Sequence, residues 1–243
     1  EQGDADAAQA AERMLSQGRG VARFDDGPVS HFGHLPQVLF VSGSFDAGDG
    51  ARISAGIDRL SPQVIVLHSQ GGIVGEAMEV ADLIHQRGLA TYIPPGAECV
   101  SACVYVFSAG RQRIVQGELG VHQLQAAQGD AVVPIRDFQA VISQILAAMN
   151  RYAVPSFLIE RILGSSDMYF LTWNERNQLS RGSLEDVEGI DTELIRSVLD
   201  YQFAENTAGA SGAETDHAAL SGEEATPDPA PSQECAPDAT QVR

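Results

Sequence analysis

The sequence contains no lysine, since all 15 of its basic residues are arginine. This absence excludes three kinds of site. A Ser-Lys catalytic dyad, a Schiff-base enzyme and a Walker-type phosphate loop all depend on a lysine amine. A serine nucleophile in this chain would therefore need a base other than lysine.

Positive charge is scarce, and long hydrophobic runs are missing. The 15 basic residues stand against 33 acidic ones, for a formal net charge of -18. Surfaces that bind nucleic acids or anionic membranes need clustered positive charge, so we expect no nucleic-acid partner. No stretch of about 18 apolar residues occurs, so we expect no membrane insertion by this chain.

The length of 243 residues favours one domain with flanking tails. Residues 1–35 are predicted to be an N-terminal arm that could include a helix, and residues 36–203 the folded domain. The composition of residues 204–243, acidic and rich in Ala and Pro, predicts a disordered tail. The chain begins at Glu1 rather than Met, so processing or truncation could have removed an export signal or an anchor.

Short apolar runs alternate with amphipathic segments through the domain. The predicted strands are residues 38–41, 64–67, 89–93 and 113–115, and the predicted helices are residues 51–60, 73–86, 135–152 and 154–163. Because parallel strands need crossover connections, this order predicts an α/β fold with a mostly parallel sheet flanked by helices. Ligands of such sheets bind beyond the carboxyl ends of the strands.

Two turns at predicted strand ends have an unusual composition. Ser101 follows the turn that begins at Gly96 and precedes an apolar helical segment, so its hydroxyl is expected near a helix N-terminus. Serine is a preferred N-cap, and capping is the alternative to a catalytic role. Gly71 and Gly72 open the helix after another strand, where unpaired N–H groups can face a developing negative charge.

Four short motifs resemble those of the Clp protease proteolytic subunit and its crotonase-fold relatives, in the family's order. Residues 67–74 resemble the strand that ends in Ser-Pro-Gly-Gly, and residues 101–110 the nucleophile helix that closes in Ser-Ala-Gly. Residues 121–123 resemble the His-Gln turn, and residues 167–172 the segment Asp-Arg-Phe-Leu-Ser. The resemblance implies a spiral fold of repeated ββα units over residues 36–203.

The resemblance also assigns roles to residues. Ser101 would be the nucleophile, His122 the base and Asp167 the acid that orients the imidazole, with the N–H groups of Gly72 and Ala102 as the oxyanion hole. An extended peptide would pair with the strand edges, in contact with Gly71, Ile73, Val74, Gln123 and Leu124. These roles describe a serine endopeptidase-like hydrolase that acts on peptides or proteins without a metal, a cofactor or ATP dependence of its own. A helix like residues 135–152 builds the oligomer in that family, so we expect a homo-oligomer.

Several alternatives stay open from the sequence. His68 also lies at a strand end, and Asp137, Asp186 and Asp191 are other candidates for the acid. Two further functions fit the same resemblance. The first is acyl-CoA hydratase or isomerase chemistry, which uses the paired oxyanion amides but has no need of Ser101. The second is a non-catalytic scaffold or binding module that kept the fold.

Cys99 and Cys103 flank Ser101 at a spacing of four residues. In a helix this spacing puts their Cα atoms about 6 Å apart, within disulfide reach. We therefore predict a disulfide, with buried thiols or a cysteine nucleophile as the alternatives. A metal site is not favoured, because no second ligand pair follows at a suitable spacing. A disulfide would indicate an oxidising compartment, either the periplasm or another extracytoplasmic space.

Overall fold

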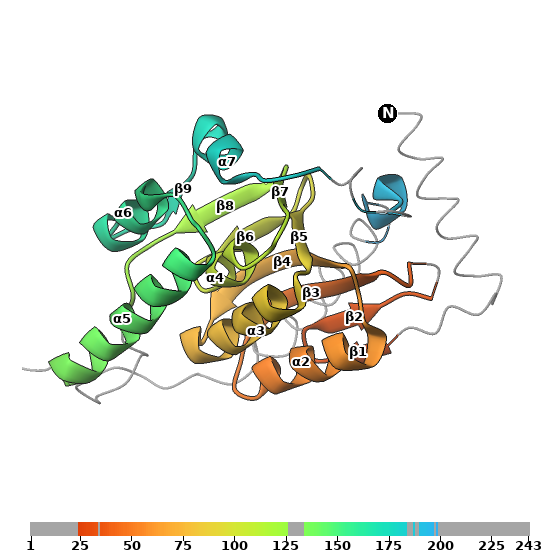
Figure 1. The fold of residues 1–243 in the computed structure, drawn as a ribbon, viewed down its shortest axis with the longest axis horizontal. Coiled ribbons are helices and arrows are strands. Elements are labelled where there is room, and N and C mark those ends of the chain that lie inside the picture. The colour runs from red at the N-terminus through yellow and green to blue at the C-terminus, as the bar shows by residue number, and fades with distance from the viewer. Residues whose placement is uncertain are drawn as a thin grey trace, which may run out of the picture. The chain divides into compact units, whose positions relative to one another are not determined.

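Figure 1 shows the computed structural model, which describes residues 24–33, 35–125, 134–183, 187, 190–196 and 198. The predictions for most of the N-terminal arm, for Asp186 and for the tail of residues 204–243 lie outside the described residues.

The described chain contains every strand and helix that the sequence predicts, with shifted ends, and several that it does not. The strands are β1 (Phe24–Asp26), β2 (Val29–His31), β3 (Val38–Phe45), β4 (Val64–Gly72), β5 (Ala90–Ile93), β6 (Glu98–Val100), β7 (Arg113–Val115), β8 (Glu118–Val121) and β9 (Tyr169–Phe170). The helices are α2 (Asp49–Leu60), α3 (Val74–Arg87), α4 (Cys103–Ser108), α5 (Ile135–Arg151), α6 (Ser156–Gly164) and α7 (Trp173–Leu179).

Strand β4 belongs to two branches of the sheet. On one side β4 pairs in parallel with β3 along its whole length, up to Gly72. On the other side its first half pairs in parallel with β5, whereas Ser69 in its second half pairs with Cys99 of β6. One branch continues from β5 to β7 and the other from β6 to β8. The units β5–β6–α4 and β7–β8–α5 thus each give one strand to either branch. The expected α/β class with repeated ββα units is confirmed.

The expectation of a mostly parallel sheet is confirmed only in part. Five of the eight pairings between described strands are parallel, and β1–β2, β2–β3 and β8–β9 are antiparallel. The hairpin β1–β2 differs from the arm expected before residue 36. Gly27 takes a positive φ of 60° in its turn, and Val29 is fully buried in the core. The Asp-Gly-Pro turn signal and this burial favour a hairpin over a helix.

The sheet is covered on both faces, which explains the uninterrupted apolar runs of its strands. Helices α2 and α3 lie side by side against the sheet (Figure 1). Leu39 packs in the larger apolar cluster with the residues of these helices, and its neighbour Phe40 packs in a second cluster. Successive strand residues point to opposite faces, so a strand buried on both sides is apolar throughout. None of the described helices is long and apolar enough to cross a membrane.

Candidate active site

Three neighbouring strands bring the predicted motifs to one edge of the sheet. Strand β6 lies between β4 and β8 and is parallel to both, with Val100 opposite Gly120. The carboxyl ends of parallel strands meet at the same edge. Gly72 ends β4, Ser101 follows β6 and His122 follows β8, so 50 residues of sequence separate groups that lie together in space.

Ser101 and His122 form a hydrogen-bonded pair. The distance from Ser101 Oγ to His122 Nε2 is 2.8 Å, and both side chains are half-buried. The Ser101 N–H donates to the carbonyl of Gly120 at 3.0 Å, which fixes the serine turn against β8. Ala102, not Ser101, is the N-cap of α4, and no side chain caps this helix. The Ser101 hydroxyl therefore contacts the imidazole rather than capping α4.

The second ring nitrogen of His122 determines which way the Ser101 bond runs. His122 Nδ1 lies 2.6 Å from the carbonyl oxygen of Gln123. A carbonyl oxygen can only accept, so Nδ1 carries the proton. In a neutral imidazole Nε2 is then unprotonated and accepts the hydroxyl proton of Ser101. This is the tautomer that a general base needs.

Ser101 lies in a strained turn that only a glycine neighbour permits. Its φ is 55°, in the left-handed region that residues with a Cβ seldom occupy. A Cβ on Gly71 would lie 2.7 Å from the Cβ of Ser101 and 2.7 Å from the carbonyl oxygen of Val100. Gly71 itself is held by its N–H, which donates to Ser69 Oγ at 3.1 Å. Because Gly71 has no side chain, the end of β4 can pack directly against the turn that contains Ser101.

The two predicted oxyanion residues lie beside this pair. Among the residues that the structure describes, the N–H of Ala102 has no hydrogen-bond acceptor. Gly72 and Ala102 line the same cavity as Ser101 and His122, with a volume of about 140 Å³. The Tyr105 side chain also lines it, and burial raises the pKa of this phenol to about 12. The phenol is therefore protonated at neutral pH.

A larger apolar groove adjoins the cavity. It has a volume of about 600 Å³, and it shares Gly72, Val74, Leu124 and Gln125 with the cavity lining. Its other apolar lining residues are Phe45, Ile73, Met78, Phe138, Val141 and Ile145. Four predicted substrate residues thus line one or both spaces: Ile73, Val74, Gln123 and Leu124. Gly71 is buried and lines neither of them.

The structure does not bring Asp167 to His122. The Asp167 side chain is exposed, and its Oδ2 accepts a hydrogen bond from Ser166 Oγ at 3.3 Å. The two other described candidates for the acid also bond elsewhere. Asp137 pairs with Arg136 at 3.4 Å, and Asp191 accepts from the N–H of Leu194 at 3.0 Å. The place of an orienting carboxylate is occupied by the Gln123 carbonyl.

His68 has a different environment from His122. Its Nδ1 accepts the N–H of Glu98 at 3.1 Å, which places the ring between β4 and β6. Burial lowers the pKa of His68, and the nearby Glu98 carboxylate raises it by a smaller amount. A neutral ring accepting a backbone N–H is a structural group of the sheet.

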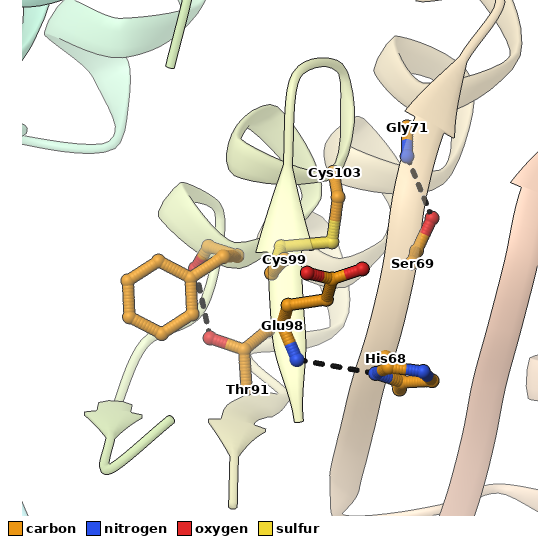
Figure 2. The surroundings of a disulfide bond; sticks show 8 residues. His68, Ser69, Gly71, Thr91, Glu98, Cys99 and Cys103 are labelled. Atoms are coloured by element: carbon orange, nitrogen blue, oxygen red, sulfur yellow. Dashed lines mark hydrogen bonds between the residues drawn. A yellow bond between two sulfur atoms is a disulfide. The ribbon is translucent and has the colours of Figure 1, made fainter. Parts of the chain in front are cut away.

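A disulfide joins Cys99 and Cys103 across the serine turn, as predicted. Their Cα atoms are 5.3 Å apart, and both residues are fully buried. Cys99 lies in β6 and Cys103 begins α4, so the link spans a strand–turn–helix rather than one helical turn. Figure 2 shows the bond next to Ser69 and Gly71 of β4. Oxidation excludes a free thiolate at either position, and the described residues hold no cluster of metal ligands.

No family model matches the chain, and no curated protein matches it. Solved structures do match. One is a mutant of the membrane-bound stomatin-specific protease 1510-N, with 16% identity and a TM-score of 0.43, over 58% of this chain and 74% of that one. Another is a mutant of ClpP1 from Listeria monocytogenes, with 15% identity and a TM-score of 0.41, over 60% of this chain and 88% of that one.

The segment after Asp167 is anchored by Glu175, which the sequence analysis missed. Thr172 and Glu175 form a capping box at the start of α7, and the pattern Thr-x-x-Glu could have revealed it. Tyr169 and Arg161 also donate to the Glu175 carboxylate, at 3.0 and 2.9 Å. Burial raises the pKa of Glu175, but these hydrogen bonds outweigh it and lower the pKa to about 2.

We expect Glu175→Gln to lower the free energy of unfolding at pH 7 by about 1–2 kcal/mol, because charge-assisted bonds are lost. A lowered pKa makes this stabilisation fully present above the ordinary value of 4.5 and lost as the pH falls through about 2. Urea unfolding from pH 2 to pH 7 should show the two proteins converging in acid.

Glu118→Gln is the matched control, since Glu118 pairs with Arg176 at 2.8 Å but is 55% exposed. Its effect should stay below about 0.5 kcal/mol. An unfolding free energy that differed by the same amount at every pH between wild type and Glu175→Gln would contradict the role of the carboxylate.

Proposed function

We propose that this chain is a serine hydrolase that cleaves peptides, with Ser101 as the nucleophile and His122 as the general base. The observation that carries the proposal is the 2.8 Å bond from Ser101 Oγ to an imidazole nitrogen that the Gln123 carbonyl leaves unprotonated. A hydroxyl next to an unprotonated imidazole is the arrangement that activates serine for attack.

The reaction would follow from this geometry in two stages. Ser101 Oγ attacks the substrate carbonyl carbon while its proton moves to His122 Nε2. The N–H groups of Gly72 and Ala102 would donate to the oxyanion. His122 then gives the proton to the leaving amine as the C–N bond breaks. In the second stage His122 takes a proton from water, the hydroxide attacks the ester carbon, and the proton returns to Ser101 as the acid leaves.

The surroundings of the pair support a peptide as the substrate. The ends of β4 and β8 border the cavity, and the residues after them, Val74 and Leu124, line both the cavity and the apolar groove. An extended chain placed between these ends could pair with backbone groups while its apolar side chains enter the groove. Such pairing would hold the scissile carbonyl next to Ser101.

A fluorophosphonate probe tests the proposal, because it forms a covalent bond with an activated serine. We expect intact-mass analysis to show one label on the wild-type protein and none on Ser101→Ala. Ser156→Ala is the matched control, since Ser156 is exposed at the start of α6 and should leave labelling unchanged. A folded wild-type protein that takes up no label would contradict the proposal and turn the search to acyl-CoA chemistry or a binding role.

A further inference from the structure

Gln123 is hydrogen-bonded through both its side chain and its backbone. Its N–H donates to the carbonyl of Ser165 at 2.8 Å, and its Nε2 donates to the carbonyl of Leu163 at 2.7 Å. Leu163 lies in the last turn of α6, where the backbone carbonyls have no N–H donor within the helix. Gln123 thus links the end of α6 to the turn that contains His122.

We propose that Gln123 is the positioning residue for the His122 base, in the role that the family resemblance assigns to Asp167. This inference rests on the proposed function and names what orients its base. With the N–H and the side chain both held, the Gln123 carbonyl keeps one direction. That carbonyl accepts the Nδ1 proton at 2.6 Å, so the Nε2 lone pair faces Ser101.

The segment around Asp167 takes part through its backbone instead of its carboxylate. Ser165, two residues before Asp167, supplies the carbonyl that accepts the Gln123 N–H. The Asp167 carboxylate itself is exposed and bonded to Ser166. A neutral carbonyl fixes the tautomer by geometry alone, whereas a carboxylate would also stabilise the charged imidazolium. The two arrangements therefore respond differently to mutation and to pH.

Gln123→Glu keeps the side-chain size but replaces the amide donor with an oxygen that repels the Leu163 carbonyl. We expect the rate constant for fluorophosphonate labelling of Ser101 to fall about tenfold, because a misplaced base loses its alignment. Gln123→Arg, unlike Gln123→Glu, keeps an N–H donor at this position, so its labelling rate constant should lie within about threefold of the wild-type value. Gln178→Glu makes the same charge change on the exposed surface of α7 and should alter the rate by less than about twofold.

Asp167→Asn discriminates between the two arrangements. If the Gln123 carbonyl orients the base, its labelling rate stays within about twofold of wild type and the acid limb of the pH–rate profile does not move. A loss of tenfold or more, or a shift of that limb to lower pH, would overturn the proposal and restore Asp167 as the orienting acid. A wild-type labelling rate for Gln123→Glu would overturn it as well.

An imidazole ¹⁵N spectrum separates this inference from the proposed function. The signals that disappear in His122→Ala identify the ring, and in wild type they should report a proton on Nδ1. Gln123→Glu should shift these signals, and Asp167→Asn should leave them in place. If the probe fails to label wild-type Ser101, the proposed function fails, yet the spectrum still decides what holds His122. A proton on Nε2 in wild type would refute the inference.

Discussion

His122→Ala should lower the rate of Ser101 acylation by a factor of about 10⁴ or more. The Nε2 atom of His122 is the acceptor for the Ser101 hydroxyl in this structure, at 2.8 Å. Without it the hydroxyl keeps its proton, and a neutral serine is a weak nucleophile at pH 7. No lysine exists in the chain to replace the lost base. Fluorophosphonate labelling measures this range of rates when samples are quenched at intervals from seconds to hours and the labelled fraction is determined by intact-mass analysis.

His85→Ala is the control for the loss of an imidazole. His85 lies late in α3, where its ring contacts Tyr152 at a centroid distance of 4.8 Å. Its removal should change the labelling rate by less than about twofold, since it does not touch the reacting groups. A rate for His122→Ala within tenfold of wild type, in a protein that still folds, would show that another group activates Ser101. His68 would then be the next residue to test.

The sequence predicts the part of this site that depends on local patterns. Apolar runs bounded by glycine-rich turns identify β3, β4, β5 and β7, and the rule for parallel sheets places the turns that follow such strands at one edge. The short strands β6 and β8, which directly precede Ser101 and His122, are not predicted from the sequence. Ser101 and His122 each follow a strand of that edge, and the structure joins them. The Cys99–Cys103 bond follows in the same way, because four residues of spacing limit how far the cysteines can separate.

The remaining features have no local signature. Every residue has a carbonyl, so nothing in the sequence singles out that of Gln123 as the acceptor for His122. A sequence motif indicates Asp167, but the direction of its carboxylate depends on packing that the motif does not record. The homo-oligomer and the extracytoplasmic location stay predictions, since neither is a property of one folded chain.

Gly72→Ala is expected to cause the largest loss of stability among single substitutions near the site, about 3 kcal/mol or more. Gly72 has a φ of 138°, a conformation that residues with a Cβ rarely adopt. A Cβ there would lie 2.4 Å from the carbonyl oxygen and 2.7 Å from the nitrogen of Phe45. Both atoms belong to the β3 backbone and cannot rotate away, so β4 must shift from β3 at the edge of the sheet where Gly72 lines the Ser101 cavity.

Two other glycines separate the causes of that loss. Gly48 has a φ of 89° with open space around it, so Gly48→Ala carries backbone strain alone and should cost about 1 kcal/mol. Gly75 lies in α3 with neither strain nor a close neighbour, and Gly75→Ala should raise stability by about 0.5–1 kcal/mol. Urea unfolding of the three variants measures the series. If Gly72→Ala lost no more than Gly48→Ala, the β3 contact would not constrain the end of β4, and the placement of Gly72 in the cavity that holds Ser101 would need another explanation.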